Sequence, residues 1–307
     1  MSRAVTISIL TYKRHQHLRR ALASALGYAD QVAEILVVDN AAEPELKSLL
    51  AAEFPGVRYI AAESNAGCEG RNLALRAAST PIVITLDDDV ELSSVECIAE
   101  VEAAFSRDQR LACLNFTVTG VDGKVLERDW CHPRPISHAA REFETHFILE
   151  GASALSREIV LSVGGYPAEF FLGHEGVDLS YRLIGAGYRV VHTPRVSATH
   201  HAALEQRPDW RVYYYYTRNG IWVVYRSFPP LMAIPRMIAH LTTMGFFSLR
   251  ARQLRAYVRG CVDGARGLSR MDRHNLDADS LKHVRELRSE RVPLFGRIQR
   301  RFRERIL

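Results

Sequence analysis

The chain has 307 residues, of which 47% are hydrophobic, so it can form one large domain or two smaller ones with a substantial core. Its five cysteines have no CxxC spacing, which argues against a disulfide framework or a zinc site and predicts reduced thiols in a cytoplasmic setting. The formal net charge of +5 is a C-terminal property, because residues 251–307 hold 15 Lys and Arg against 7 Asp and Glu. Anionic lipid, nucleic acid and solvent are all candidate partners for that basic surface.

The first part of the chain alternates strand and helix patterns. The N-terminus enters the first strand directly, without the apolar stretch and cleavage site of a signal peptide. Runs that are apolar on both faces, separated by amphipathic helices, are typical of a mostly parallel sheet covered by helices on both sides, which predicts an α/β fold. The expected strands are 5–10, 35–38, 57–60 and 82–86, and the expected helices are 15–26, 44–54 and 70–78.

Polar residues follow three of these predicted strands at the point where each strand ends. They are Thr11-Tyr12, Asp39-Asn40 and Asp87-Asp88-Asp89. In parallel sheets ligands bind at the carboxyl ends of the strands, so these groups are expected to share one site. Adjacent carboxylates after a buried strand repel one another, and a divalent cation with oxygen ligands is the usual way to offset that repulsion. A solvated acidic turn is the alternative interpretation of the triplet.

The middle of the chain is less regular. Residues 112–118 and 124–126 are expected to pair across the turn at Asp122-Gly123, and residues 127–146 are expected to form an irregular loop near the site. A strand is predicted over 147–155, a helix over 178–186 that ends at Gly187, and a strand over 189–192.

From about Pro208 the pattern becomes helical, so we expect a catalytic domain over 1–205 and a helical, basic region over 206–307. The apolar stretches in this region are interrupted by charged residues and prolines, and none reaches the roughly 18 residues that a membrane span requires. Two interpretations remain open. One is an amphipathic hairpin that lies on a membrane surface and is followed by a basic tail, and the other is a helical subdomain packed on the sheet.

Taken in chain order, these groups resemble the family 2 glycosyltransferases, which are inverting enzymes with the GT-A fold. The resemblance covers about residues 4–201 and also rests on the Asn65–Asn72 segment, the Glu175-Gly176-Val177-Asp178-Leu179 motif and His200. The region from Tyr213 onward is similar to the C-terminal helical extension of bacterial, rhamnosyltransferase-like members that build cell-surface glycans. The resemblance implies transfer of a sugar from a UDP-, dTDP- or GDP-sugar to a glycan, polyprenyl-linked or small-molecule acceptor.

The resemblance also implies roles for the strand-end residues. A divalent metal, Mg²⁺ or Mn²⁺, would neutralise the charge that develops on the leaving diphosphate. Its implied ligands are Asp89, Asp87 and His200, with Asp88 contributing to the metal or to the donor. The other implied donor contacts are Thr11, Tyr12, Asp39, Asn65, Gly67 and Arg71.

Several of these residues have structural alternatives. Asp39 is equally suited to capping a turn or a helix. Arg71 is alternatively an arginine on a solvated helix surface. For His200, a structural or solvent-facing histidine is the competing interpretation, and its neighbour His201 cannot be separated from it by sequence.

Inverting transfer needs a general base that takes the proton of the acceptor hydroxyl. In the family this base comes from a Glu-Asp-x-Asp-Leu motif, whose second acid is Gly176 here. Glu175 is therefore the preferred base, and Asp178, one turn further along a helix, is the second catalytic candidate. Asp178 is also suited to be an N-cap or an anchor for Arg182, and His174 is a further candidate for the base.

Two other functions remain as alternatives. The first is a nucleotidyltransferase acting on a sugar phosphate, which is disfavoured because residues 10–14 lack the glycines of a phosphate loop. The second is a membrane-associated protein that binds nucleotide sugars without catalysis, on the cytoplasmic face of the inner membrane. Nucleic acid is not expected as a partner, because the basic tail has no aromatic platform or recognised motif.

Overall fold

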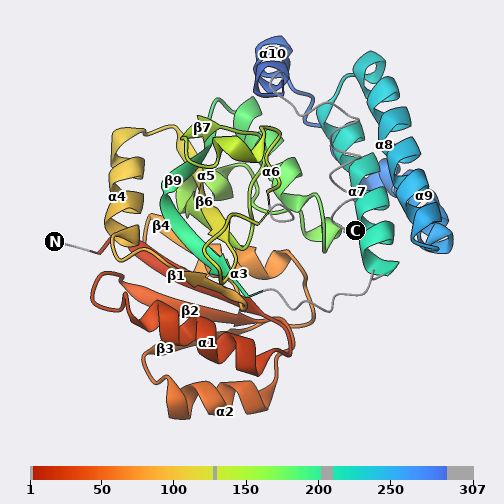
Figure 1. Ribbon diagram of the computed structural model, residues 1–307. Helices are drawn as coiled ribbons and strands as arrows, with labels where there is room; N and C mark the ends of the chain where they lie inside the picture. Colours follow the sequence, from red (N-terminus) through yellow and green to blue (C-terminus); the bar gives the residue numbers. More distant parts are fainter. Residues whose placement is uncertain (1–2, 127–129, 202–209, 289–307) are drawn as a thin grey trace.

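A computed structural model describes residues 3–126, 130–201 and 210–288. Within these residues a nine-stranded sheet has helices against both of its faces (Figure 1). The first four strands, in the order β3-β2-β1-β4, are all parallel and are joined by α1 (His15–Leu26), α2 (Pro44–Glu53) and α3 (Glu69–Ala77). The strands themselves are β1 (Val5–Thr11), β2 (Glu34–Asp39), β3 (Val57–Ala61) and β4 (Ile82–Asp87). The predicted alternation of strands and helices is confirmed for this part of the chain.

The register of these strands brings the polar strand ends together. Thr11 lies opposite Asp39 on the neighbouring strand, and Leu10 lies opposite Asp87 on the other side. Because all three strands run in the same direction, their carboxyl ends meet at one edge of the sheet. The three polar groups that were expected to share one site therefore lie at the same edge of the sheet.

The second half of the sheet is mixed. β8 (Ala152–Ser156) runs antiparallel to both β4 and β6 (Leu111–Thr119), whereas β9 (Arg189–His200) runs parallel to β6. β5 (Val90–Leu92) and β7 (Phe143–Glu144) pair antiparallel with β9. The predicted parallel arrangement thus describes the N-terminal strands and the β6–β9 pair.

Three local predictions were wrong in their limits. The strand expected over 147–155 begins only at Ala152. The Asn115 side chain donates a hydrogen bond to Phe147 O (2.9 Å) and accepts one from Leu149 N (2.6 Å), and these bonds replace pairing with a neighbouring strand. β9 continues past Pro194, since a register shift in its pairing with β6 between Asn115 and Thr117 accommodates the proline. Lys124–Leu126 does not form a strand, and only Val125 makes a bridge, to Thr119.

Two helices were not expected from the sequence. They are α4 (Cys97–Arg107), which precedes β6, and α5 (Arg157–Ser162), which follows β8 directly. In addition α6 spans Glu175–Gly185, so it begins three residues before the predicted start at Asp178. This earlier start places Glu175 in the first turn of the helix.

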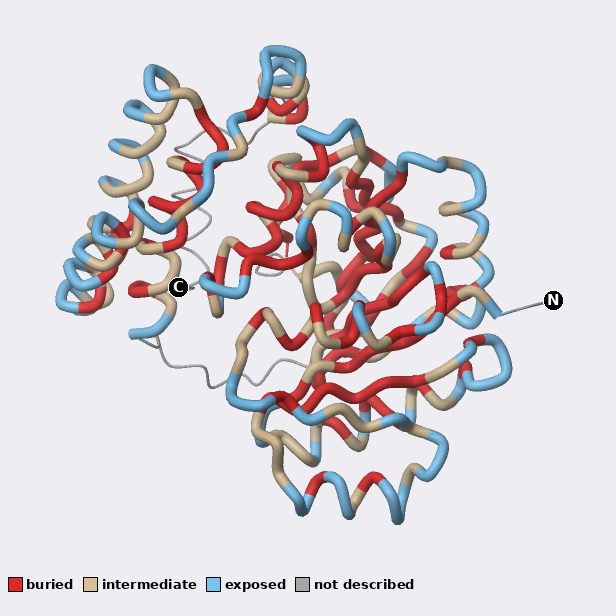
Figure 2. Tube along the Cα trace, turned by 180° about the vertical axis from the view of Figure 1, so that it is seen from behind, coloured by how far each residue is buried: buried red, intermediate tan, exposed pale blue. Residues whose placement is uncertain are grey.

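Alternate residues of the buried strands supply two separate cores, and Figure 2 shows the buried residues concentrated in the strands and in the helix faces against them. Ile7, Ile84 and their neighbours pack with α1, α2 and α4 on one face. Leu36 and Val83 point to the other face, where α3, α5 and α6 contribute apolar side chains. This alternation follows from the two-residue repeat of a strand.

The C-terminal region consists of α7 (Trp210–Ser227), α8 (Pro230–Arg250), α9 (Leu254–Gly267) and α10 (Ala278–Leu287). Figure 1 shows α7, α8 and α9 stacked beside one end of the sheet. Ile221 and Trp222 of α7 belong to the same core as α6, so α7 is packed on the part of the chain that contains the sheet. The boundary predicted at 205/206 and the basic tail beyond residue 288 lie outside the described residues.

Candidate active site

Asp87 is the last residue of β4, and Asp88 and Asp89 form the turn that follows it. Asp88 and Asp89 are 4% and 6% exposed, whereas the Asp87 side chain is 45% exposed. Thr11 Oγ1 donates a hydrogen bond to Asp88 Oδ2 at 2.8 Å. Arg14 bridges the two buried acids, with Nη1 2.8 Å from Asp88 Oδ1 and Nη2 2.7 Å from Asp89 Oδ2. The triplet is therefore not a solvated acidic turn.

The two adjacent histidines of β9 have different partners. β5 pairs with β9 so that Val90 lies opposite His200, which places this histidine beside the preceding residue, Asp89. His200 Nε2 lies 3.5 Å from Asp89 Oδ1, whereas His201 Nε2 lies 2.9 Å from Glu91 Oε1. Of the two histidines, His200 is therefore the one that lies beside Asp89.

The pKa values of the two buried acids are shifted in opposite directions. Burial is the main influence on Asp88 and raises its pKa to about 6, although Thr11 and Arg14 oppose the shift. Burial would also raise the pKa of Asp89, but hydrogen bonds from His200 and Arg14 outweigh it and hold this pKa below its usual value. Asp89 is consequently the more strongly ionised of the two.

The site suits a divalent ion that keeps several non-protein ligands. Asp89 and His200 are near enough to bind one ion together, and the carboxylate and imidazole are ligands that Mn²⁺ accepts. Asp87 is instead bonded to Arg71 Nη2 at 2.6 Å. Across the described ranges, no three His, Cys, Asp or Glu side chains are grouped so that they would enclose a metal. This fits Mg²⁺ or Mn²⁺ held by one or two protein groups and completed by phosphate oxygens.

Arg71 is a buried part of the site and not a surface arginine. Its side chain is only 10% exposed, and Nε and Nη1 have no hydrogen-bond partner in the described structure. Buried donors without partners are unfavourable unless a ligand supplies acceptors. Phosphate oxygens are suitable acceptors for a guanidinium.

The segment before Arg71 is shaped by Gly67, whose backbone has a φ of +54° that favours glycine. A side chain at this position would also overlap Phe171 O, so glycine is required for the close packing of the two loops. Asn65 Oδ1 accepts a hydrogen bond from Gly67 N at 3.3 Å, and Cys68 N donates to Phe171 O at 2.9 Å. Asn65 and Gly67 therefore shape the loop that leads into α3, the helix that carries Arg71.

Asp39 has the capping role that was considered as an alternative. It is fully buried, and its carboxylate accepts hydrogen bonds from Ala41 N and Glu43 N, both at 2.8 Å, and from Tyr59 Oη at 3.0 Å. The side chain thus fixes the turn between β2 and α2. Tyr12, by contrast, is 42% exposed at the end of β1.

Two acids meet at the start of α6. Glu175 is 7% exposed, and burial together with the nearby charge of Glu150 raises its pKa to about 8. Glu150 Oε1 accepts a hydrogen bond from Gly176 N at 2.8 Å. His174 precedes the helix with a left-handed φ of +66° and packs against the rings of Tyr216 and His240. These ring contacts favour a structural role for His174 over that of a base.

Residues 6–164 match the family Glycosyl transferase family 2, which amounts to more than half of the chain. The chain belongs to this glycosyltransferase family. It is 27% identical over 239 residues to the N-acetylglucosaminyl-diphospho-decaprenol L-rhamnosyltransferase of Mycobacterium tuberculosis, an alignment that covers 66% of this chain and 78% of that protein.

Two solved structures show the same fold as this glycosyltransferase. S. aureus TarS 1–349 in complex with UDP-GlcNAc has a TM-score of 0.59 at 13% identity, with 98% of this chain and 92% of that chain covered. GalNAc-T7 with UDP, GalNAc and Mn²⁺ also has a TM-score of 0.59, at 17% identity, with 74% of this chain covered. This chain spans 48% of GalNAc-T7, about half of its length. The predicted family and GT-A fold are thereby confirmed.

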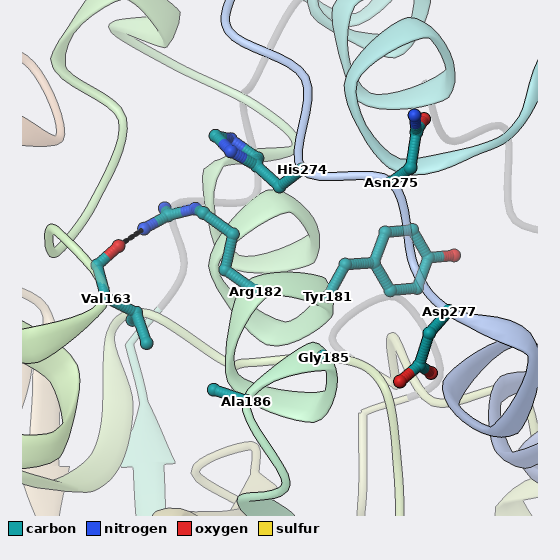
Figure 3. A pocket seen from close by; sticks show the side chains of 8 residues that line it. All are labelled: Val163, Tyr181, Arg182, Gly185, Ala186, His274, Asn275 and Asp277. Carbon is teal, nitrogen blue, oxygen red and sulfur yellow. Dashed lines mark hydrogen bonds between the residues drawn. The ribbon is translucent and has the colours of Figure 1, made fainter.

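Asp178 of this glycosyltransferase is not brought together with the aspartate triplet. It is fully buried, and its carboxylate lies 2.9 Å from Arg182 Nε and 3.4 Å from Arg226 Nε. Arg182 also donates to Val163 O, as Figure 3 shows at a hollow between the second half of α6 and the segment before α10. Asp178 therefore anchors α6 to α7, which matches its alternative role.

Sequence reasoning missed two residues of the transferase site, Arg14 and Glu150. Arg14 follows the first strand as one of two adjacent basic residues, and its guanidinium bonds two of the three aspartates. Glu150 stands between an apolar run and Gly151, whose carbonyl accepts a hydrogen bond from Asp87 N at 3.2 Å. A lone acid at the end of an apolar run was the signal that could have identified it.

Proposed function

We propose that this glycosyltransferase transfers a sugar, with inversion, from a nucleotide-diphosphate sugar to a hydroxyl group of a glycan, polyprenyl-linked or small-molecule acceptor. The observation that carries the proposal is the aspartate triplet at the carboxyl ends of the parallel strands, in which Asp88 and Asp89 are buried and which lies next to His200 and Arg71. This is the edge at which open α/β sheets bind nucleotides.

The donor would lie along this edge, with its diphosphate near Asp89 and the unpartnered donors of Arg71. Asp89 and His200 would hold Mg²⁺ or Mn²⁺, which supplies positive charge to the leaving diphosphate when it is bound. Mn²⁺ together with UDP in the GalNAc-T7 structure supports this choice of ion. Tyr12 is exposed enough to contact the nucleoside, whereas Thr11 and Asp39 would act by fixing Asp88 and the β2–α2 turn.

The proton of the acceptor hydroxyl would be taken by the carboxyl pair at the start of α6. Glu175 is the base expected from the sequence, and Glu150 is the acid that the structure adds beside it. Arg71 lies among the charges of Glu150, Glu175 and Asp87, so one buried guanidinium joins the donor side of the site to this pair.

We also propose that the enzyme works at an anionic membrane surface, on the cytoplasmic face of the inner membrane. Among the described residues, no helix combines the length and the apolar character needed to cross a bilayer. Instead α8 and α9 leave apolar side chains exposed in helical spacing, and residues 230–267 hold six arginines and one acid. The exposed side chains are Leu231, Ile234, Ile238, Phe246 and Leu249 on α8, and Leu254, Val258 and Val262 on α9.

A donor screen tests the proposed reaction. Release of nucleoside diphosphate from UDP-, dTDP- and GDP-sugars is measured with Mg²⁺ and with Mn²⁺, in the presence of a polyprenyl-linked glycan or a small hydroxylated acceptor. We expect turnover with one donor, loss of turnover when the metal is chelated, and a fall of at least 100-fold in Asp89→Asn, because that carboxylate holds the ion.

The matched control is Asp122→Asn, which changes an exposed aspartate in the turn after β6 and should retain full activity. Full activity of Asp89→Asn in the presence of a chelator would contradict the proposal. Release of pyrophosphate from a nucleoside triphosphate would favour a nucleotidyltransferase. Tight nucleotide binding without turnover would favour a binding protein.

A further inference from the structure

Position 176 is glycine because a neighbouring carboxylate and a backbone carbonyl oxygen fill the space that its own side chain would need. A Cβ atom on Gly176 would overlap Glu150 Oε1 and would lie 2.6 Å from Ile148 O and 2.9 Å from Glu150 Cδ. Gly176 N donates to the same carboxylate oxygen at 2.8 Å. A carboxylate therefore occupies the start of α6, although it comes from a different part of the chain.

Glu150 reaches this position from the loop before β8, which passes the aspartate triplet. The next residue, Gly151, approaches the triplet so closely that a Cβ atom there would lie 2.5 Å from Asp87 Cγ. Asp87 in turn binds Arg71, whose Nε and Nη1 are buried without partners. Glu150 thus lies between the donor edge of the sheet and the helix that carries the family's acidic motif.

The two acids at this helix start differ in what surrounds them. Glu175 is more than nine-tenths buried, and its Oε2 is a buried oxygen without a hydrogen-bond partner. Glu150 is partly exposed and accepts a hydrogen bond from the second residue of the helix. Backbone amides and the positive end of a helix dipole both favour an ionised carboxylate.

The electrostatic interaction between Glu150 and Glu175 also separates the two acids by their ionisation. Burial raises the pKa of both carboxyl groups, and the charge of Glu150 raises that of Glu175 further. Two carboxyl groups side by side hold one proton between them, because ionising both would place two negative charges close together. The more exposed acid with an amide partner, Glu150, is the one that would be ionised and accessible to an acceptor.

We propose that Glu150 is the general base of this enzyme and replaces the acid that is absent at position 176. This inference rests on the proposed glycosyl transfer. The proton of the acceptor hydroxyl moves to the Glu150 carboxylate as the acceptor oxygen bonds to the anomeric carbon. The bond from that carbon to the diphosphate oxygen breaks, and its electron pair leaves with the nucleoside diphosphate. Glu175 remains protonated beside it.

The test compares Glu150→Gln, Glu175→Gln and the exchange variant Glu150→Ala/Gly176→Asp. Glu150→Gln keeps an oxygen for Gly176 N but cannot take a proton, so kcat should fall about 100-fold or more while the donor KM stays within about twofold. The exchange variant places an acid on the helix after the overlapping side chain has been removed, and Ile148 O, which lies 2.6 Å from the new Cβ atom, must also shift. This variant should recover at least tenfold over Glu150→Ala.

Rates are measured as nucleoside diphosphate release from the UDP-, dTDP- and GDP-sugar panel, with acceptor and with water alone. Glu169→Gln changes an exposed acid in the loop before α6 and should match the unmodified enzyme. Chemical denaturation of each variant shows whether it folds. Retained kcat in a folded Glu150→Gln variant, with loss in Glu175→Gln, would overturn the assignment and leave glycosyl transfer standing. An unmodified enzyme without turnover on any donor would instead refute the proposed function.

Discussion

Glu175 keeps its carboxyl group buried beside a second acid, and this arrangement lowers the stability of the fold at neutral and alkaline pH. Burial and Glu150 raise the pKa of Glu175 from 4.5 to about 8, and Arg71 only partly opposes them. Between these two pH values the folded chain retains a proton that the unfolded chain has released. The free energy of unfolding therefore falls as the pH rises through this window, by up to about 1.4 kcal/mol per pH unit.

Glu175→Gln should remove this pH dependence, because glutamine cannot ionise. We expect the variant and the unmodified protein to have similar unfolding free energies near pH 5, and the variant to be more stable by about 1 kcal/mol or more at pH 8.5. Denaturant titrations at the two pH values measure the difference. The other ionisable groups that face this carboxyl, and that stay unchanged, are Glu150, Arg71, Asp87, Cys68 and Tyr166.

Glu63→Gln serves as the control, since Glu63 is exposed in a loop and its loss should change stability by less than about 0.5 kcal/mol at either pH. If Glu175→Gln gains no stability between pH 5 and pH 8.5, the buried proton is not there.

For single residues, the sequence predicted a place in the site where a residue type is unusual for its local context. Three adjacent aspartates after an apolar run have few structural explanations, so their position could be predicted. The place of Glu150 at the end of an apolar run is visible in the sequence, but its role is not, because that role depends on Gly176, which is adjacent only in the fold. Asp39 and Asp178 share the opposite problem, since acids that cap turns and acids that bind ligands have the same local pattern.

At the scale of elements, the loop from 170 to 174 has a demanding backbone that α7 holds in place. Phe171 and His174 have φ values of +62° and +66°, which are unfavourable for residues with side chains. The buried Asn219 Nδ2 lies 2.9, 2.8 and 2.7 Å from the carbonyl oxygens of Phe170, Leu172 and Gly173. This loop leads directly into Glu175, so α7 controls the start of α6.

Asn219→Ala should therefore weaken both the fold and the reaction. Leaving buried carbonyl oxygens without a donor costs about 2–3 kcal/mol, which denaturant unfolding would detect. At temperatures where the variant is still folded, kcat for nucleoside diphosphate release should also fall, because the start of α6 is no longer fixed. Asn275→Ala removes an exposed amide that contacts Arg273 and should leave both quantities nearly unchanged. Equal behaviour of the two variants would contradict this role of α7.

The predicted elements were most accurate where local pattern decides the outcome. The strands and helices of the first ninety or so residues lie close to their expected limits, because each has an apolar repeat and ends at a polar residue or turn. The strand limits near Asn115 could not be predicted, since one buried side chain takes over the hydrogen bonds of residues 147 and 149. Nor could the continuation of β9 past a proline, which depends on the partner strand.

At the scale of the whole molecule, the packing of α7 agrees with the subdomain interpretation, and the membrane-surface interpretation of α8 and α9 stays a prediction. α7 packs into the core that contains α6, whereas α8 and α9 expose an apolar face with Leu231 87% and Ile238 61% exposed. Sequence periodicity detects an amphipathic helix, but it does not say which protein surface, if any, covers the apolar face. That distinction required the three-dimensional arrangement in Figure 1.

Ile238→Asp tests the membrane surface that we propose for this face. The unmodified protein should co-sediment with phosphatidylglycerol vesicles and less with phosphatidylcholine vesicles, and binding should fall as the salt concentration rises. The variant should bind the anionic vesicles about tenfold less tightly, because a charged group replaces an inserted side chain. Val121→Asp changes an even more exposed apolar residue in the turn after β6 and should bind normally. Equal binding by Ile238→Asp and the unmodified protein would exclude this face as the contact.

The overlap between a side chain at position 176 and Glu150 also restricts how the site could have evolved. An ancestor with a side chain at this position would have needed two shifts, because Glu150 Oε1 and Ile148 O would both lie within 3 Å of a Cβ atom there. The carboxylate is the end of a flexible side chain and can turn aside, whereas Ile148 O belongs to the backbone of the loop before β8. A relative that retains the helical acid should therefore have this loop displaced from the start of α6, so the loop and the helix start would change together.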